Sequence, residues 1–510
     1  MKKSQILPTL LALTFSLVAC KEIEVVKTKK GTTSSSAAPM VDYGIALYTA
    51  QEELLGTSKL FSIDTKGVIN KIQSEEGQDL ENLYINTVIP VKSGLIFSVY
   101  NGNLNQSENY FTNGKTAQKL SYTGQFSSSK GESIDYSRSA KTRFSFFCSQ
   151  GTAMAWDDNL KTITAISQTS GSCQVAYSQN KLVVVNSDYQ MFFMGPSTIS
   201  TKITKFSFNE DSIGEPEVMS DSSSLINYVD SLDVVDNKVI MIRTIGADYS
   251  NVVRSIVSIN LDNNSSENLL SVSGNDSYIY KLTNKKLDNG KLFFVEQRYF
   301  QGDSYDVLYE DTQNVYYSST GYQNRKLISY SSQEGLSVLI DKTYQSENLG
   351  YEFIVGEDTA FVIKDQYYPS QEGDSYRTYN LYNLNDLENP ILASYYDSRV
   401  PSQQVFHFLD LKTGLIIVSK DMVQPDQPTQ KEITAYVLPS ATRELGVDKR
   451  IVLGNFNYVN FINFYGQVLY NYSSYISETD SYEMKAGFVS VLKDSAQMIE
   501  QLNPMFLNNN

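Results

Sequence analysis

Short apolar runs, each introduced by a polar turn, recur along most of this chain. The turns are built from Gly, Asn, Asp or Lys, and the runs are too short for a helix and rich in β-branched and aromatic residues. Turn residues followed by such runs are typical of strands that leave hairpins. The nine marks lie at Gly44, Gly94, Gly151, Lys181, Lys238, Gly290, Asp358, Gly414 and Gly466.

A second type of segment follows most of these marks and alternates between apolar and polar residues. In SINLD, Ile259 and Leu261 share one face while Asn260 and Asp262 share the other. This two-residue period predicts strands with one side exposed to water. The spacing between marks is mostly 50 to 57 residues, with one interval near 30 and one near 67.

This pattern predicts an all-β protein, most simply a β-propeller. A unit of about 50 residues with roughly four strands has the size of a propeller blade. The region from residue 43 to 510 would form one domain of eight blades, with seven or nine left open. Tandem β-sandwiches are the alternative, but no linker or shift in composition divides the region. The sequence motifs of known propeller families are absent, including the repeated Trp of lipid-anchored outer-membrane propellers, since Trp156 is the only Trp.

The N-terminus carries features of an export signal. Lys2 and Lys3 precede an apolar run at residues 6–19, which is shorter than the roughly 20 residues that a membrane span needs. The run ends in Leu17-Val18-Ala19-Cys20, which resembles the lipobox of bacterial lipoproteins. The resemblance implies that residues 1–19 are removed and that fatty acyl groups are attached to Cys20. The alternative is an unmodified cysteine after an ordinary signal peptide.

The residues after Cys20 are expected to form a tether. Residues 20–42 are short of aromatic residues and rich in Lys, Thr and Ser, so they cannot bury enough surface to fold. Several acyl chains together anchor a protein stably to a membrane. By resemblance to enterobacterial lipoproteins, Lys21 in place of an Asp directs the chain to the outer membrane.

Charge and cysteine content narrow the possible partners. Loss of Lys2 and Lys3 with the leader leaves 40 basic against 57 acidic side chains, a net charge of −17. Such a chain repels phosphates, so nucleic acid is not an expected partner. Beyond Cys20, only Cys148 and Cys173 remain, and an even number outside the cytoplasm favours a disulfide. Two free thiols or a metal pair are the alternatives.

The usual components of an enzyme are missing from the sequence. The single histidine, His407, lies in an alternating run with Val405 and Leu409, which is typical of a partly buried strand residue. No nucleophile elbow, phosphate loop, calcium loop or His–Cys zinc set is present, so no catalytic residue, metal or cofactor is expected. Carboxylates remain the one route to catalysis. Asp157-Asp158 and Glu210-Asp211 are interpreted as turn residues.

A long connection between Gln297 and Arg325 carries many aromatic residues. Loops of this length in compact folds are usually functional, and tyrosines are enriched in binding surfaces. The connection is either a recognition loop or an extra hairpin. Its aromatic residues are Tyr299, Phe300, Tyr305, Tyr309, Tyr316, Tyr317 and Tyr322.

Together these features favour a lipid-anchored propeller of the cell envelope that binds a protein or a glycan. The alternative hypothesis is a carboxylate-based enzyme acting on polysaccharide.

Overall fold

The computed structural model describes residues 25–27 and, with breaks, residues 44–506. The longer breaks fall at residues 102–105, 127–141, 191–197, 283–290, 311–314, 369–375, 398–403, 423–429 and 438–448, and shorter ones separate other strands. For residues 300–322, and for most residues after 345, the backbone is described but the side chains are not.

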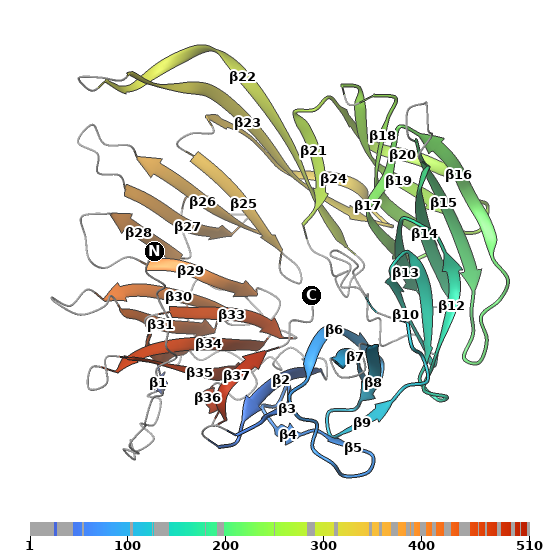
Figure 1. The fold of residues 1–510 in the computed structure, drawn as a ribbon. Helices are drawn as coiled ribbons and strands as arrows, with labels where there is room; N and C mark the ends of the chain where they lie inside the picture. Colours follow the sequence, from blue (N-terminus) through green and yellow to red (C-terminus); the bar gives the residue numbers. More distant parts are fainter. Residues whose placement is uncertain are drawn as a thin grey trace, which may run out of the picture.

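The described strands form nine sheets that stand around a common centre, which is the arrangement of a β-propeller (Figure 1). Sheet 1 contains β2 (Ile45–Gln51), β3 (Ser58–Asp64), β4 (Ile69–Lys71) and β37 (Leu502–Phe506). Sheet 2 contains β5 (Gln73–Ser74), β6 (Tyr84–Val91), β7 (Gly94–Asn101), β8 (Gln106–Thr112) and β9 (Thr116–Lys119). Sheet 3 contains β10 (Phe144–Ser149), β11 (Thr152–Asp157) and β12 (Thr162–Gln168).

Sheets 4 to 6 follow in the same manner. Sheet 4 contains β13 (Ser172–Ser178), β14 (Lys181–Gln190), β15 (Thr198–Ser207) and β16 (Glu217–Ser224). Sheet 5 contains β17 (Ile226–Val235), β18 (Lys238–Gly246), β19 (Val252–Asn260) and β20 (Ser266–Ser273). Sheet 6 contains β21 (Ser277–Lys281), β22 (Leu292–Glu310), β23 (Val315–Ser331) and β24 (Gly335–Gln345).

Three further sheets complete the series. Sheet 7 contains β25 (Leu349–Val355), β26 (Ala360–Tyr368), β27 (Tyr376–Asn383) and β28 (Leu392–Asp397). Sheet 8 contains β29 (Gln404–Asp410), β30 (Leu415–Met422), β31 (Gln430–Val437) and β32 (Lys449–Phe456), with β1 (Val25–Lys27) at its edge. Sheet 9 contains β33 (Tyr458–Phe464), β34 (Gln467–Ile476), β35 (Ser481–Ser490) and β36 (Ser495–Ile499).

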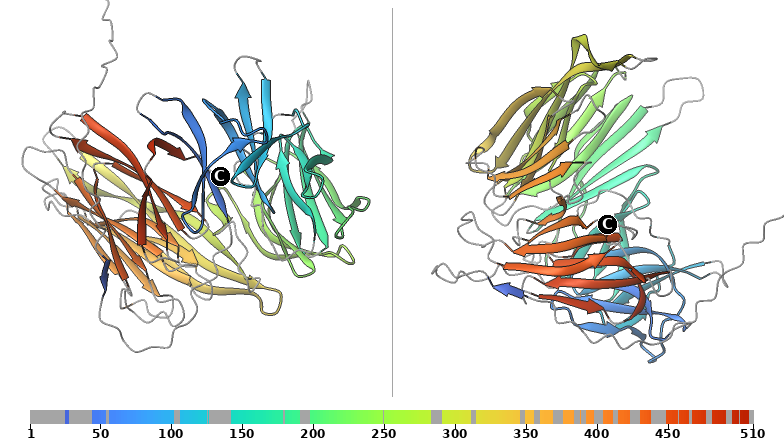
Figure 2. Two further views of the ribbon diagram at one scale, coloured as in Figure 1. Left: turned by 90° about the horizontal axis from the view of Figure 1, so that it is seen from below. Right: turned by 90° about the vertical axis from the view of Figure 1, so that its left-hand side faces the viewer.

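The two ends of the propeller region meet in sheet 1. The last strand, β37, pairs antiparallel with the first strand of the region, β2, with Tyr48 opposite Phe506. The hydroxyl of Tyr48 donates a hydrogen bond to Oε1 of Gln501 at 3.1 Å. Sheet 9, drawn in red, lies beside sheet 1, drawn in blue, in both views of Figure 2. The chain therefore closes on itself through backbone pairing between its ends.

The hydrophobic core is divided into layers between neighbouring sheets. On β14, Leu182 and Val184 pack towards sheet 3, while Val183 and Val185 pack towards sheet 5. A strand with two buried faces needs a continuous apolar run, which is why this segment reads LVVV. The outermost strand of the same sheet, β16, alternates between exposed and half-buried residues, and it lies on the outer side of the ring in Figure 1.

The described residues form nine sheets, one more than the preferred prediction of eight blades and within the range of seven to nine that the sequence left open. Each of the nine sequence marks lies at the start of a strand in a different sheet. The short interval after Gly151 arises because this mark lies at the end of its sheet opposite to the end at which the neighbouring sheets carry their marks. The start of β10 and the end of β11 lie beside the turn between β6 and β7, where the Lys92 amide donates to Ser145 Oγ at 3.0 Å and Ser93 contacts Asp158.

The described part of the segment from Gln297 to Arg325 is neither a long loop nor a hairpin separate from the sheet. It is the outer part of β22 and β23, which pair from Leu292 opposite Tyr330 to Glu310 opposite Val315. Tyrosine and valine favour strands, so the segment continues the sheet instead of leaving it. The 19 residues of β22 and the 17 of β23 account for the widest interval between marks. Figure 1 shows this hairpin reaching beyond the neighbouring sheets.

The predicted leader, residues 1–19, and Cys20 lie outside the described residues. Of the predicted tether, Val25–Lys27 is described, and these three residues pair antiparallel with Lys449–Ile451 of β32. At these three positions the backbone lies against the open edge of sheet 8, and the rest of the predicted tether lies outside the described residues. Among the described residues, no helix is long and apolar enough to cross a membrane.

Cys148 and Cys173 form a disulfide between β10 and β13, with their Cα atoms 5.9 Å apart. Both cysteines are buried in the apolar layer between sheets 3 and 4. We predict that the Cys148→Ala/Cys173→Ala variant loses about 3 kcal/mol of unfolding free energy, because the 25-residue separation no longer restricts the unfolded chain. Guanidinium unfolding with and without reductant measures this. Reductant should not shift the midpoint of the variant, and an equal midpoint for oxidised and reduced wild type would contradict the prediction.

A buried ion pair joins sheets 5 and 6. Lys281 Nζ lies 2.5 Å from Asp233 Oδ2, and the two side chains are 4% and 3% exposed. We predict that Lys281→Met lowers the unfolding free energy by about 3–5 kcal/mol, because the Asp233 charge would stay buried without the Lys281 cation. The double variant Asp233→Leu/Lys281→Met should recover most of this loss.

Denaturant unfolding checks the ion-pair prediction against a surface control. Lys119, 60% exposed, pairs with Glu108 at 2.6 Å, and Lys119→Met should cost about 1 kcal/mol or less. If Lys281→Met and Lys119→Met lost the same unfolding free energy, the buried pair would contribute no more to stability than the exposed pair.

Candidate functional site

The most exposed group of aromatic side chains in the described part of sheet 6 comes from β21 and β22. Along β21, Ser277 and Ile279 are buried while Tyr278 and Tyr280 are 41% and 38% exposed. Ile279 packs into the layer between sheets 5 and 6. The two-residue period therefore turns both tyrosines to the face of sheet 6 that points away from sheet 5.

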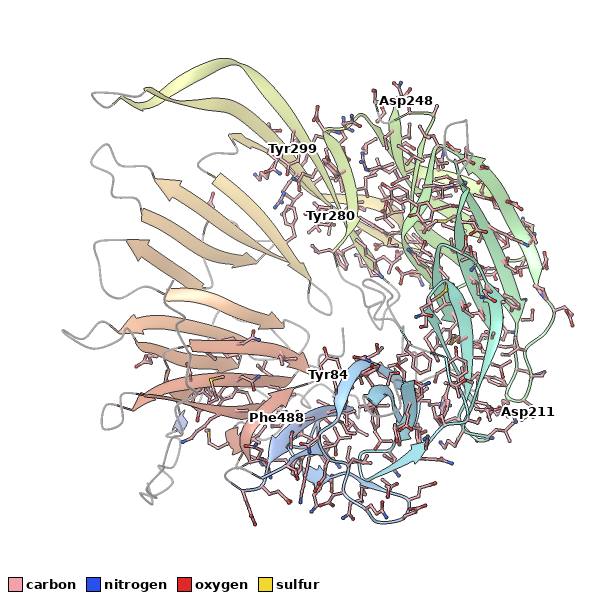
Figure 3. All side chains as sticks on the ribbon, in the orientation of Figure 1. Tyr84, Asp211, Asp248, Tyr280, Tyr299 and Phe488 are labelled. Carbon is pink, nitrogen blue, oxygen red and sulfur yellow. A yellow bond between two sulfur atoms is a disulfide. The ribbon has the colours of Figure 1, made fainter. Side chains whose placement is uncertain are left out.

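Tyr299 of β22 joins the two tyrosines on this face. Its ring packs edge-on against Tyr278 with centroids 6.2 Å apart, and its side chain is 45% exposed. The Tyr299 amide donates to the Asp276 carbonyl at 2.8 Å, which fixes β22 beside the start of β21. We call Tyr278, Tyr280 and Tyr299 the tyrosine cluster; Figure 3 shows Tyr280 and Tyr299 on the same side of β21.

Polar side chains hold the tyrosine cluster in place. Gln297 lies opposite Tyr278 in the sheet and contacts the Tyr299 hydroxyl through its amide nitrogen. Arg325 Nε donates to Gln297 Oε1 at 3.1 Å. From sheet 5, the guanidinium of Arg254 lies 4.6 Å from the centre of the Tyr278 ring, a cation–π distance. Ordered rings of this kind lose little conformational freedom when they bind a partner.

Arg254 is anchored to the backbone at the junction of sheets 5 and 6. Its Nη1 donates to the carbonyl oxygens of Gly274 and Ser277 at 3.2 and 2.8 Å. These bonds fix the guanidinium over Tyr278. The junction between two sheets thus positions a cation beside an exposed aromatic surface.

A single carboxyl with a raised pKa lies nearby on β17. A register shift after Val229 makes Asp230 the extra residue of a bulge, and Thr244 Oγ1 donates to its Oδ2 at 2.6 Å. Desolvation by the surrounding protein raises the pKa of Asp230, although its side chain reaches solvent. The hydrogen bond from Thr244 and the charge of Arg254 act in the opposite direction. A glycosidase would need a second carboxylate in a defined position beside it.

The buried carboxylates of the described residues are each bound to a cation. Asp157 pairs with Arg143, Asp233 with Lys281, and Glu296 with Arg298, at 2.9, 2.5 and 2.6 Å. They belong to sheets 3, 5 and 6, so each stabilises its own part of the fold.

Of the acidic runs interpreted as turn residues, Asp157 is the last residue of β11 and Asp158 begins the turn that follows. Glu210 and Asp211 lie in the turn after β15. Asp157 Oδ1 accepts the amides of Asn159 and Leu160 at 3.0 and 3.1 Å. Arg143 also reaches Asp211 at 3.3 Å, and so links turns of sheets 3 and 4. These contacts are structural.

The alternation expected around His407 is interrupted. His407 is the extra residue of a bulge in β29, because Phe406 pairs with Val418 and Phe408 with Ile417. Its side chain lies outside the described residues. Within the described ranges, no group of three or more His, Cys, Asp or Glu side chains is placed to hold a metal ion.

Of the seven aromatic residues predicted to form a binding loop, Tyr299 has a described side chain and belongs to the cluster. The other six lie on β22 and β23, where the backbone alone is described: Phe300, Tyr305, Tyr309, Tyr316, Tyr317 and Tyr322. Sequence analysis missed Tyr278 and Tyr280. Their signal was the alternation in SYIYK, which places two tyrosines on one face of a short strand.

Comparisons with known proteins bear on the fold and not on the site. No protein-family model matches the chain, and no curated protein matches it. Among solved structures, it is similar to Porphyromonas gingivalis dipeptidyl peptidase 4, with 10% identity over 86% of this chain and 65% of that one and a TM-score of 0.42.

Two isolated domains are also similar to this chain. The β-propeller domain of the Trilobed protease from Pyrococcus furiosus has 7% identity, 82% and 96% coverage of this and that chain, and a TM-score of 0.31. The WD40 domain of Toxoplasma gondii coronin has 11% identity, 72% and 88% coverage, and a TM-score of 0.30. The chain spans 45% to 65% of the length of the peptidases that it matches.

Proposed function

We propose that this protein is a lipid-anchored β-propeller of the bacterial cell envelope that binds a partner protein or glycan through the tyrosine cluster. The observation that carries this proposal is the exposure of Tyr278, Tyr280 and Tyr299 on one face of sheet 6. Large aromatic side chains with a polar end supply much of the binding energy at recognition sites.

The hairpin of β22 and β23 supports the same proposal. It continues outward from Tyr299, and its sequence carries six more aromatic residues among Ser, Asn, Gln and Asp. This mixture of rigid aromatic and adaptable polar residues is typical of binding surfaces. A two-stranded extension also offers length that a compact turn lacks, so a partner could be contacted beyond the ring.

The N-terminal sequence supports the proposed location. The resemblance of residues 17–20 to a lipobox, with Lys2, Lys3 and the apolar run before it, supports acylation of Cys20 and attachment to the outer membrane. The tether would then hold the propeller close to the membrane, with Val25–Lys27 bound to sheet 8. The tyrosine cluster would then lie where envelope proteins and polysaccharides are concentrated.

A carboxylate-based enzyme acting on polysaccharide is the second candidate, and Asp230 is the residue that favours it. Its raised pKa suits a general acid. The buried carboxylates of the described residues, however, are held by cations. Binding is therefore the better-supported function.

We predict that Tyr278→Ala/Tyr299→Ala weakens partner binding at least tenfold. Each substitution deletes a ring whose contact with the partner is worth on the order of 1 kcal/mol or more. The assay immobilises the chain from Lys21 onwards and titrates it with purified outer-membrane proteins and, separately, with envelope polysaccharides. Tyr84→Ala is the matched control, because Tyr84 is 70% exposed on sheet 2, away from the cluster. Equal binding by the cluster variant and the control would rule out the cluster as the contact surface.

The anchoring step has its own test. Mass spectrometry of native protein should find Cys20 as the first residue, bearing fatty acyl groups. Cys20→Ala should leave the membrane fraction, and its unfolding midpoint should equal that of the chain from Lys21 onwards, which lacks the acylated residue. A native N-terminus that retains residues 1–19, or a bare Cys20, would disprove lipid anchoring.

A further inference from the structure

A hollow of about 510 Å³ lies between the outer strand of sheet 4 and the face of sheet 5 that points towards it. Met219 of β16 borders it on one side, and Met241 and Val257 of sheet 5 form an apolar floor. Ile245, Val253 and Ile259 add to the apolar part of the sheet 5 wall, and polar side chains make up the rest. The hollow is separate from the tyrosine cluster, which lies on sheet 6.

One row across sheet 5 gives the hollow its polar character. Arg243 on β18, Ser255 on β19 and Ser271 on β20 are consecutive partners in the sheet register, and their side chains line the hollow together. The hydroxyls of Ser255 and Ser271 lie 2.7 Å apart. Further amide and hydroxyl groups come from Asn251, Ser266 and Asn268.

Arg243 is the one cation among the residues that line the hollow. Its Nε and Nη2 donate to Asn227 Oδ1 at 3.3 and 3.1 Å, and Nη2 also contacts Ser222 Oγ. Asn227 is 1% exposed and is held in turn by the Ser222 carbonyl at 2.8 Å. A buried amide thus fixes the plane of the guanidinium.

The charge of Arg243 has no counterion in the described part of the chain. No described carboxylate lies within ion-pair distance of it, although the protein carries 57 acidic side chains. Its Nη1 makes no hydrogen bond with a described residue and is not sealed from solvent. Burial lowers the pKa of Arg243, which reflects the cost of placing an uncompensated charge there.

We infer that the hollow binds a hydroxyl-bearing carboxylate of the acidic-sugar type. One guanidinium with a free nitrogen suits a ligand with one negative charge, because phosphate sites generally gather several cations or backbone amides. The row of Ser and Asn groups can exchange hydrogen bonds with sugar hydroxyls, and the methionines offer contact to an apolar ring face. The ligand could be a free sugar acid or a sugar acid within a polysaccharide, since the recognising chemistry is shared.

Calorimetric titration of the chain from Lys21 onwards with D-glucuronate, D-glucose and an oligomer of glucuronate tests this inference. We expect glucuronate to bind with a Kd of about 1 mM or tighter and at least tenfold better than glucose. Arg243→Gln should weaken glucuronate binding at least tenfold while glucose is unaffected. A tighter Kd for the oligomer would identify a polysaccharide as the source, and a tighter Kd for the monomer a free sugar acid.

Two variants keep the test decisive. Lys202→Gln removes a cation from the opposite face of sheet 4, where Lys202 is exposed, and should bind as the wild type does. If Arg243→Gln fails to fold, the variant Ser255→Ala/Ser271→Ala replaces it. It removes the two serine hydroxyls that would bind the ligand, with little change in shape, and should weaken binding about fivefold. The inference would be overturned if the wild type did not bind, or if the Kd values for glucuronate and glucose were equal. It would also be overturned if Lys202→Gln lost as much affinity as the variants of the residues that line the hollow.

Discussion

The packing of each sheet against both of its neighbours is the constraint on which this structure depends. Val183 and Val184 are adjacent in the chain, yet one packs towards sheet 5 and the other towards sheet 3. Strands buried on two faces leave no side of the sheet for water, so the inner strands carry mainly apolar residues on both faces. The pairing of β37 with β2 follows from the same constraint, because a ring that stayed open would expose apolar faces at both of its ends.

The buried charges described inside these layers are paired with opposite charges. The Lys281–Asp233 ion pair and the Cys148–Cys173 disulfide each connect two neighbouring sheets. Glu296 and Asp157 are likewise bound to cations. These pairs stabilise the described part of the fold by compensating charges that burial would otherwise leave without a counterion.

Recognition can then occur where the layers end. The tyrosine cluster lies where β21 and β22 present a face of sheet 6 that is not fully covered, and Arg254 reaches it from the neighbouring sheet. Arg243 lies on the other side of sheet 5, at a place where its layer with sheet 4 opens into a hollow. The first surface offers aromatic area and the second offers a single fixed charge, so the two suit different ligands.

The sequence by itself determined the strand content, the repeat of the sheets and the turns that begin their strands, because two-sided burial requires continuous apolar runs that can be read directly. It also pointed to Tyr299.

Only the tertiary structure decided the number of sheets, since Gly151 marks a turn at the opposite end of its sheet and spacing alone does not reveal which end a turn occupies. The partnership of Arg243, Ser255 and Ser271, like that of Tyr278 with Arg254, depends on the register between separate strands. Register is set by packing and pairing across the sheet, and no local pattern along the chain encodes it.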